Sequence, residues 1–321
     1  MLSALLFFVG LTLLGFGGFA MYAAFFAADR PRRPRPGLLQ KIVALTMTAA
    51  AAPVLALAVM SLPPKEGADA LHAAAPPLAV SSLNVELSEK HAKEGEMLLT
   101  LGYWEEAVQQ FDLAIAINPN NADALRDRGF THNRLGHYRA ALSDLTQAIA
   151  LDERIAAAHH HRAVVYAKIG DVETAVAGFS RAIELRPEYA SAFSKRAALV
   201  ARRGAYGDAE RDFLKAIEID PDEPDTLRRL AWLYATCPRE NYRKGAEAVR
   251  LAEQAVALDK QNDWRRPEAL AAAYAETGDF EKAVYWQDRA IELSPVTLEN
   301  EAIARKALYT VGQPYRDDSR F

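Results

Sequence analysis

GYWEEAVQQFDLAIAINP, residues 102–119, decides the fold, because its small and helix-ending residues return at intervals of 34 positions. Glycine and two alanines each keep this interval over four consecutive units, and proline keeps it in three of them, with Glu153 in the remaining slot. A period of this length is typical of stacked helical repeats. The sequence therefore predicts an all-α chain. The recurring residues are Gly102, Gly136, Gly170 and Gly204; Ala107, Ala141, Ala175 and Ala209; Ala114, Ala148, Ala182 and Ala216; and Pro119, Pro187 and Pro221.

Each unit of this period reads as two short antiparallel helices. Alanines stand where the two backbones must approach closely, and large apolar residues such as Trp104, Phe111 and Ile115 recur at helical spacing around them. The glycine ends the first helix, where a left-handed residue is favoured. The proline stops the second helix and directs the chain to the next unit.

This pattern resembles the tetratricopeptide repeat (TPR) family. The resemblance covers most of the chain after residue 87 and rests on Glu105-Glu106-Ala107, Phe111, Ala114, Asn118-Pro119 and the run from Tyr274 to Ala283. It implies a right-handed α-solenoid of about six helix-turn-helix repeats. Solenoids of this kind present a long groove to a protein or peptide partner and rarely hold catalytic groups. Laid on the TPR template, the units fall at residues 88–121, 122–155, 156–189, 190–223, 224–262 and 264–297.

The end of the solenoid departs from the regular pattern in two places. Ala216 and Ala255 stand further apart than the period allows, so we expect an insertion in the turn of the fifth unit, around residues 237–241. The segment 298–311 predicts a C-terminal capping helix, which places the solenoid with its cap at 88–312 and a tail at 313–321. The expected buried face of this helix consists of Ala304, Ala307, Leu308 and Val311.

The N-terminal segment, residues 1–62, has a different character. Two uncharged stretches, about 2–28 and 42–62, each reach the roughly 20 apolar residues that cross a bilayer. A basic turn, residues 29–41, separates them, so residues 1–62 predict a transmembrane helical hairpin. A cleaved signal peptide is the alternative for the first stretch, but its start lacks Lys or Arg and its apolar run is long. An Ala/Pro-rich linker, 63–87, follows.

The basic turn also predicts the orientation. Positive charge stays on the cytoplasmic side, so we expect a multi-pass protein of the inner (cytoplasmic) membrane whose TPR domain faces the periplasm. The reverse topology, with a cytosolic solenoid, would require translocation of the arginine-rich turn. Neither stretch holds Asp, Glu, Lys, Arg or His, which indicates an anchor rather than a transport pathway. Rows of small residues in both stretches would let the two helices pack on each other or on another membrane protein.

Charge separates the two parts of the chain. Residues 1–62 hold five basic side chains and one acidic, a net charge of +4, and since the whole chain carries −4, the remainder carries −8. A mildly acidic solenoid argues against general nucleic-acid binding.

The first helices of a TPR solenoid line its groove, and here their groove positions are rich in cations. Arginine offers paired donors to a carboxylate, so these positions predict a site for an acidic peptide or a C-terminal carboxylate. The alternative is that they form ion pairs with neighbouring helices or are solvated. The Lys-Asn pair that chaperone-binding TPR domains use is not found. The candidates are Arg126, Phe130, Asn133, Arg134, His160, Lys168, Ser194, Arg202, Arg228 and Trp232.

Other chemistry has little support in the sequence. The run His159-His160-His161 cannot close on one metal ion, because neighbours on a helix point about 100° apart. No phosphate-binding loop, nucleophile elbow or paired acid and base is found, so we expect no enzymatic activity, no cofactor and no metal. Cys237 is the only cysteine, and we expect it to be buried or paired with another chain.

Two classes of function fit these features. In the first, a membrane-anchored scaffold binds peptides or proteins outside the cytoplasm, as an assembly factor or as a subunit of a membrane complex. In the second, the chain is an accessory or regulatory subunit of a membrane enzyme of envelope biogenesis. The layout of two spans followed by repeats is also similar to the TPR component of c-type cytochrome maturation, which implies an assembly role.

Overall fold

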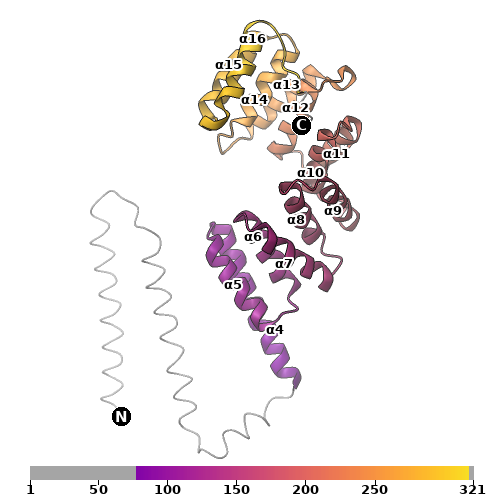
Figure 1. The fold of residues 1–321 in the computed structure, drawn as a ribbon, viewed down its shortest axis with the longest axis vertical. Coiled ribbons are helices and arrows are strands. Elements are labelled where there is room, and N and C mark those ends of the chain that lie inside the picture. Colours follow the sequence, from indigo (N-terminus) through magenta and orange to yellow (C-terminus); the bar gives the residue numbers. More distant parts are fainter. Residues whose placement is uncertain (1–76, 318–321) are drawn as a thin grey trace, which may run out of the picture. The chain divides into compact units, whose positions relative to one another are not determined.

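A computed structural model describes residues 77–317 of the chain, and residues 78–317 belong to one compact unit. The described residues form 13 α-helices, two short 3-10 helices and no strand (Figure 1). The predicted hairpin, residues 1–62, and the linker up to residue 76 lie outside the described residues. No helix in the described part of the chain is both long enough and apolar enough to cross a membrane.

The helices follow one another as antiparallel pairs, which confirms the all-α solenoid that the 34-residue period predicts. A single helix, α16, closes the series. Short 3-10 helices, η1 (Glu240–Tyr242) and η2 (Val296–Leu298), precede α13 and α16. The pairs are α4 (Pro77–Leu101) with α5 (Trp104–Ile117), α6 (Ala122–Arg134) with α7 (Tyr138–Leu151), α8 (Ala156–Lys168) with α9 (Val172–Leu185), α10 (Ala190–Arg202) with α11 (Tyr206–Ile219), α12 (Pro224–Thr236) with α13 (Gly245–Ala257), and α14 (Arg265–Glu276) with α15 (Phe280–Leu293); α16 is Glu299–Thr310.

The turn inside each regular pair depends on its glycine. Gly136 and Gly170 have φ values of +80° and +88°, in the left-handed region that L side chains rarely adopt. The glycine N–H bonds back to the end of the first helix, for example from Gly170 to the Ala167 carbonyl at 3.3 Å. This backbone reversal brings the second helix antiparallel onto the first.

The core runs through the pairs as a repeated layer of small and large side chains. The alanines at both crossing positions are buried, and one large residue of each second helix fills the space beside them. Because each layer contacts only its neighbours, the solenoid is stabilised pair by pair. The large residues of this layer are Phe111, Leu145, Phe179 and Phe213, which follow the same 34-residue period.

Buried ion pairs connect helices in two of the units. Arg128 donates to both oxygens of Asp144 at 2.7 and 2.8 Å, and Arg196 does the same to Asp212 at 2.8 and 2.7 Å. Such bidentate pairs are shorter and stronger than neutral hydrogen bonds. In the unit between them the slot of the aspartate holds Gly178, so this link is absent there.

Two features at the ends of the solenoid differ from expectation. Residues 77–87, assigned to the linker, form the beginning of α4, because no proline interrupts the chain after Pro77. In α16 the predicted buried face is wrong. Ala302 and Tyr309 are buried while Ala304, Ala307 and Val311 are exposed, because the helix turns Arg305 toward Glu268 of α14 to form an ion pair.

The insertion of the fifth unit lies where the spacing predicts it. Between α12 and α13, residues 237–244 carry η1, and the Lys244 N–H donates to the Tyr234 carbonyl at 3.0 Å. Cys237 is buried at the start of this loop and has a free thiol. Its burial agrees with the first of the two alternatives expected for it.

Candidate functional site

The first helices of successive pairs contact one another, α6 with α8, α8 with α10, α10 with α12 and α12 with α14. They therefore form one layer, and the second helices form the other (Figure 1). We call the surface of α6, α8, α10 and α12 that faces away from the second helices the inner face. The candidate site residues all lie on these four helices, and most of them fall in columns that follow the repeat period.

Three of the candidates are buried between neighbouring helices. His160 stacks on Tyr189 with ring centroids 4.7 Å apart, and its Nε2 lies 3.2 Å from the Ser191 hydroxyl. Ser194 accepts a 2.9 Å hydrogen bond from the Thr226 hydroxyl. Asn133 is 3 % exposed. These side chains join the repeats to one another and do not present themselves to a ligand.

The two arginines in the column of His160 face carboxylates of their own helices. Arg126 donates from Nε to Asp127 at 2.8 Å and also pairs with Asp123. Arg228 lies 3.7 Å from Asp225, and burial lowers its pKa to about 10. The alternative expectation of ion pairs within the solenoid therefore describes this column.

A second column remains exposed at the ends of the first helices. Arg134 lies over the Trp104 ring at 4.6 Å, and Lys168 lies over Tyr138 at 5.5 Å. Arg202 is exposed beside the cavity described below. These cations border the inner face, and Lys168 also donates to the Asn133 carbonyl at 3.3 Å.

The aromatic candidates are half-buried on the inner face. Phe130 lies 4.8 Å from the ring of His161. Trp232 donates from Nε1 to Asp317 Oδ2 at 3.0 Å, and its ring lies 5.9 Å from that of Tyr315. Both side chains therefore offer an apolar surface next to charged groups.

A further column lies one residue after that of His160, and sequence reasoning missed it. This column contains His161, Lys195 and Arg229, which are separated by the repeat period. The period could therefore have identified the column, but the candidates were taken one residue earlier on each helix. Within residues 77–317, neither Lys195 nor Arg229 has a hydrogen bond, an ion pair or a ring contact, although both are half-buried. Burial and then the charge of Arg229 lower the pKa of Lys195. These two cations form the unneutralised part of the inner face.

A cavity of about 260 Å³ opens beside these cations between α10 and α12. It offers three guanidinium groups and one indole on its walls, with a single carboxylate from the C-terminal end of the described chain. Its polar and aromatic lining consists of Arg202, Arg228, Arg229, Trp232 and Asp317.

The segment after α16 docks on this end of the inner face without forming a helix. The Asp317 N–H donates to the Thr236 carbonyl at 3.0 Å, and its carboxylate accepts the Trp232 bond. Arg316 pairs with Glu276 at 2.7 Å. The chain thus places one of its own carboxylates, on an extended backbone, against the first helices.

Charge is distributed unevenly along the inner face. At its α4 and α6 end, a cavity of about 450 Å³ is lined by Glu96, Asp123 and Arg126 together with several asparagines. The unneutralised cations lie further on, at α10 and α12. A bound peptide with acidic residues would therefore place them at Lys195 and Arg229 rather than at α6.

The arrangement supports binding of carboxylates. Among residues 77–317 no three or more His, Cys, Asp or Glu side chains are grouped so that they could hold a metal ion. Burying a cation without a partner is unfavourable, because the cation loses contact with water. A carboxylate ligand would compensate this loss with charge-assisted hydrogen bonds.

The buried histidines predict a loss of stability in acid. Burial lowers the pKa of His160 to about 3 and that of His161 to about 4, from an ordinary value of 6.5. The unfolded chain therefore binds these protons more readily than the folded chain, so stability falls as the pH decreases from about 6.5 toward 4. Between pH 7 and pH 5 each of the two histidines contributes about 2 kcal/mol, so we expect the wild type to lose about 3–4 kcal/mol more than the variant His160→Asn/His161→Gln.

Urea denaturation at the two pH values measures this difference. Carboxylates elsewhere are common to both proteins, so their contribution cancels in the comparison. Equal losses of stability in the two proteins would show that the histidines are protonated in the folded state.

Comparison with known proteins identifies the repeats. Family models described as tetratricopeptide repeat match residues 96–165, 163–224 and 268–297. Comparison with curated protein sequences finds no match.

Solved structures also align with this chain. One, described as a functional characterization of Pseudomonas aeruginosa pilF, shows the same fold, with a TM-score of 0.59 and 18 % identity, and the alignment covers 69 % of this chain and 98 % of that one. The crystal structure of MamA aligns with a TM-score of 0.38 and 21 % identity over 62 % of this chain and 93 % of that one. The first TPR of Spaghetti (RPAP3), bound to the HSP90 peptide SRMEEVD, aligns with a TM-score of 0.35 and 21 % identity, over 36 % and 92 %.

Proposed function

The chain belongs to the tetratricopeptide repeat family, and from this premise we propose that it is a membrane-anchored scaffold whose inner face binds an extended, acidic segment of a partner protein outside the cytoplasm. TPR domains bind protein or peptide partners, and TPR proteins are generally non-catalytic scaffolds. Here we add that the partner segment binds at α10 and α12 and that it is acidic.

The observation that carries the proposal is the pair of unneutralised cations on α10 and α12. Lys195 and Arg229 are half-buried, and burial lowers the pKa of each. The charge of Arg229 lowers the pKa of Lys195 further. Asp225 and Glu223 offset this effect only in part, and within residues 77–317 neither forms an ion pair with Lys195 or Arg229; Asp225 is within ion-pair distance of Arg228 and Arg266 instead. A carboxylate from a ligand would relieve this repulsion.

The docked C-terminal segment supports an extended ligand. Residues 313–317 lie on the first helices without helical structure, and Asp317 reaches the indole of Trp232. Ala198, Arg229 and the indole line the cavity that continues from this contact. A partner segment of similar backbone and charge would use the same kinds of contact.

The membrane part of the proposal rests on the sequence. Two uncharged apolar stretches with an arginine-rich turn support a hairpin anchor in the inner membrane and a solenoid on the periplasmic side. A scaffold held there would bind its partner at the membrane surface, either during assembly of a membrane complex or as one of its subunits.

A peptide titration of the full-length chain in mild detergent tests the proposed ligand. The probe is a short fluorescent peptide rich in Asp and Glu, and the control has the same length with Asn and Gln in their place. We expect the acidic peptide to bind at least about tenfold more tightly, since each charge-assisted bond is worth about 1.5–3 kcal/mol. We also expect added salt to weaken binding. Equal affinities for both peptides would contradict the proposal.

A further inference from the structure

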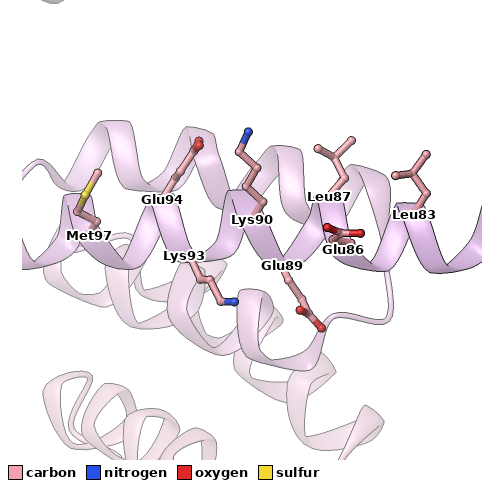
Figure 2. A pocket seen from close by; sticks show the side chains of 8 residues that line it. All are labelled: Leu83, Glu86, Leu87, Glu89, Lys90, Lys93, Glu94 and Met97. Atoms are coloured by element: carbon pink, nitrogen blue, oxygen red, sulfur yellow. The ribbon is translucent and has the colours of Figure 1, made fainter.

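One side of α4 carries a row of large side chains that nothing in the described part of the chain covers. We call this row the α4 stripe. Figure 2 shows four members of the stripe, Leu83, Leu87, Lys90 and Glu94, projecting to the same side of the helix. Its apolar members are strongly exposed, Leu83 to 63 %, Met97 to 58 % and Leu101 to 62 %. The α4 stripe consists of Leu83, Leu87, Lys90, Glu94, Met97 and Leu101.

The spacing within the stripe is that of a coiled-coil seam. Its steps alternate between four and three residues from Leu83 to Leu101, so at 3.6 residues per turn all six side chains fall within about 40° of one line. The opposite side of α4 is already used, since Ala92 is buried in the cluster around Phe111 of α5. The stripe lies on the side of α4 away from this contact and is open to a second helix.

The order of residues in the stripe is symmetric about Ala92. Leu83 and Leu101 are nine residues from it, Leu87 and Met97 five, and Lys90 and Glu94 two. If two copies of α4 lie antiparallel about a two-fold axis at the level of Ala92, leucine meets leucine and leucine meets methionine at both ends. At the centre, each Lys90 then meets the Glu94 carboxylate of the other copy.

We propose that the α4 stripe binds the α4 stripe of a second copy of this chain, in this antiparallel arrangement. The charges select the direction. In a parallel pair Lys90 would face Lys90, and Glu94 would face Glu94, which is unfavourable. Within residues 77–317, Lys90 has no ion pair, and the only ion-pair contact of Glu94 is the ring of His91 at 3.6 Å. Both groups are therefore available to a symmetric partner.

The contact is self-complementary but modest in size. The stripe spans about 27 Å of helix, which places the contact at the low end of specific interfaces. A cavity of about 530 Å³ runs along it, lined by Leu83, Leu87, Lys90 and Met97 with the neighbouring acidic side chains. This inference does not depend on peptide binding at the inner face, because the stripe lies on a different helix.

A charge swap tests the proposal. The full-length chain is studied in mild detergent, and its dimer dissociation constant is measured by sedimentation equilibrium. We expect Lys90→Glu to raise this constant at least about tenfold, because it places four carboxylates at the centre of the contact. We expect the double variant Lys90→Glu/Glu94→Lys to restore dimerisation. Only a second copy with the same change can restore it; a lipid surface or an unrelated helix cannot.

Disulfide formation tests the direction of the two helices. In a background with Cys237→Ala, we expect Leu87→Cys/Met97→Cys to form disulfide-linked dimers, and Leu87→Cys alone not to form them. A parallel pair would link the Leu87→Cys variant as well, since position 87 would then face its own copy. The proposal is overturned by a chain that stays monomeric, by a dimer that Lys90→Glu does not weaken, by a charge swap that does not restore the dimer, or by linkage through Leu87→Cys alone.

Discussion

Replacement of Phe179 by alanine is expected to lower the free energy of unfolding by about 3–5 kcal/mol, the usual cost of removing a buried phenylalanine. The ring is 1 % exposed and lies 5.4 Å from the imidazole of His160 on α8. It packs with small residues of α8, α9 and α10, Ala163, Ala182 and Ala192 among them. Its loss therefore leaves a cavity that joins two neighbouring repeats.

Urea denaturation followed by circular dichroism measures this effect. Leu214→Ala is the matched control, because Leu214 lies on the second helix α11 and is 48 % exposed. We expect the control to change stability by less than about 0.5 kcal/mol. Similar losses in the two variants would contradict the assignment of the 34-residue layer as the stabilising core.

Reversing the charge of the two unneutralised cations is expected to abolish binding of an acidic peptide. The variant Lys195→Glu/Arg229→Glu replaces attraction by repulsion at α10 and α12, so we expect the dissociation constant to rise at least about 100-fold. The same variant should bind a peptide in which lysines replace the acidic residues. Arg211→Glu/Lys215→Glu on α11 is the matched control, with the same change in net charge on the second-helix layer.

Fluorescence anisotropy with both peptides measures the exchange of specificity. If the inner-face variant and the α11 variant lose the same affinity, the effect is one of net charge and the inner face is not the site. Circular dichroism should show unchanged helix content, because neither Lys195 nor Arg229 makes a contact that holds the fold within residues 77–317.

The repeat period was sufficient to predict the helix pairs, because the residues that recur with it are required by the backbone geometry of each turn and each helix crossing. Gly170 at the left-handed turn and Ala175 at the helix crossing are each demanded by backbone geometry close to them in sequence. The all-α solenoid and the long inter-helix loop around Cys237 follow from such requirements and from the one interval that departs from them.

The candidate site could be predicted to its helices and in part to its residues. Arg202, Arg228 and Trp232 line the cavity at α10 and α12, but Lys195 and Arg229 were not among the candidates. One residue turns a helix by about 100°, so a choice of register one position early selects His160, which is buried, instead of His161 and its column. Nothing in the repeat period distinguishes the two columns. Their difference arises from packing between units, where Tyr189 takes one face of His160.

Contacts between segments that are distant in the sequence also could not be predicted from the repeat pattern. Asp317 meets Trp232 across 85 residues, and Arg305 turns α16 by pairing with Glu268. Both depend on polar partners that carry no periodicity. The predicted face of α16 followed apolar residues alone and was therefore wrong.

A partner protein is proposed to lie on the inner face of the solenoid. Site-specific photo-crosslinking of the full-length chain in intact cells tests this directly, with a photoreactive residue in place of Ala198, which lines the cavity at α10, or in place of the exposed Leu214 on α11. We predict that position 198 forms a crosslink to a partner segment rich in Asp and Glu, identified by mass spectrometry, and that position 214 does not. A partner crosslinked from position 214 alone, or a segment at position 198 without acidic residues, would contradict the account.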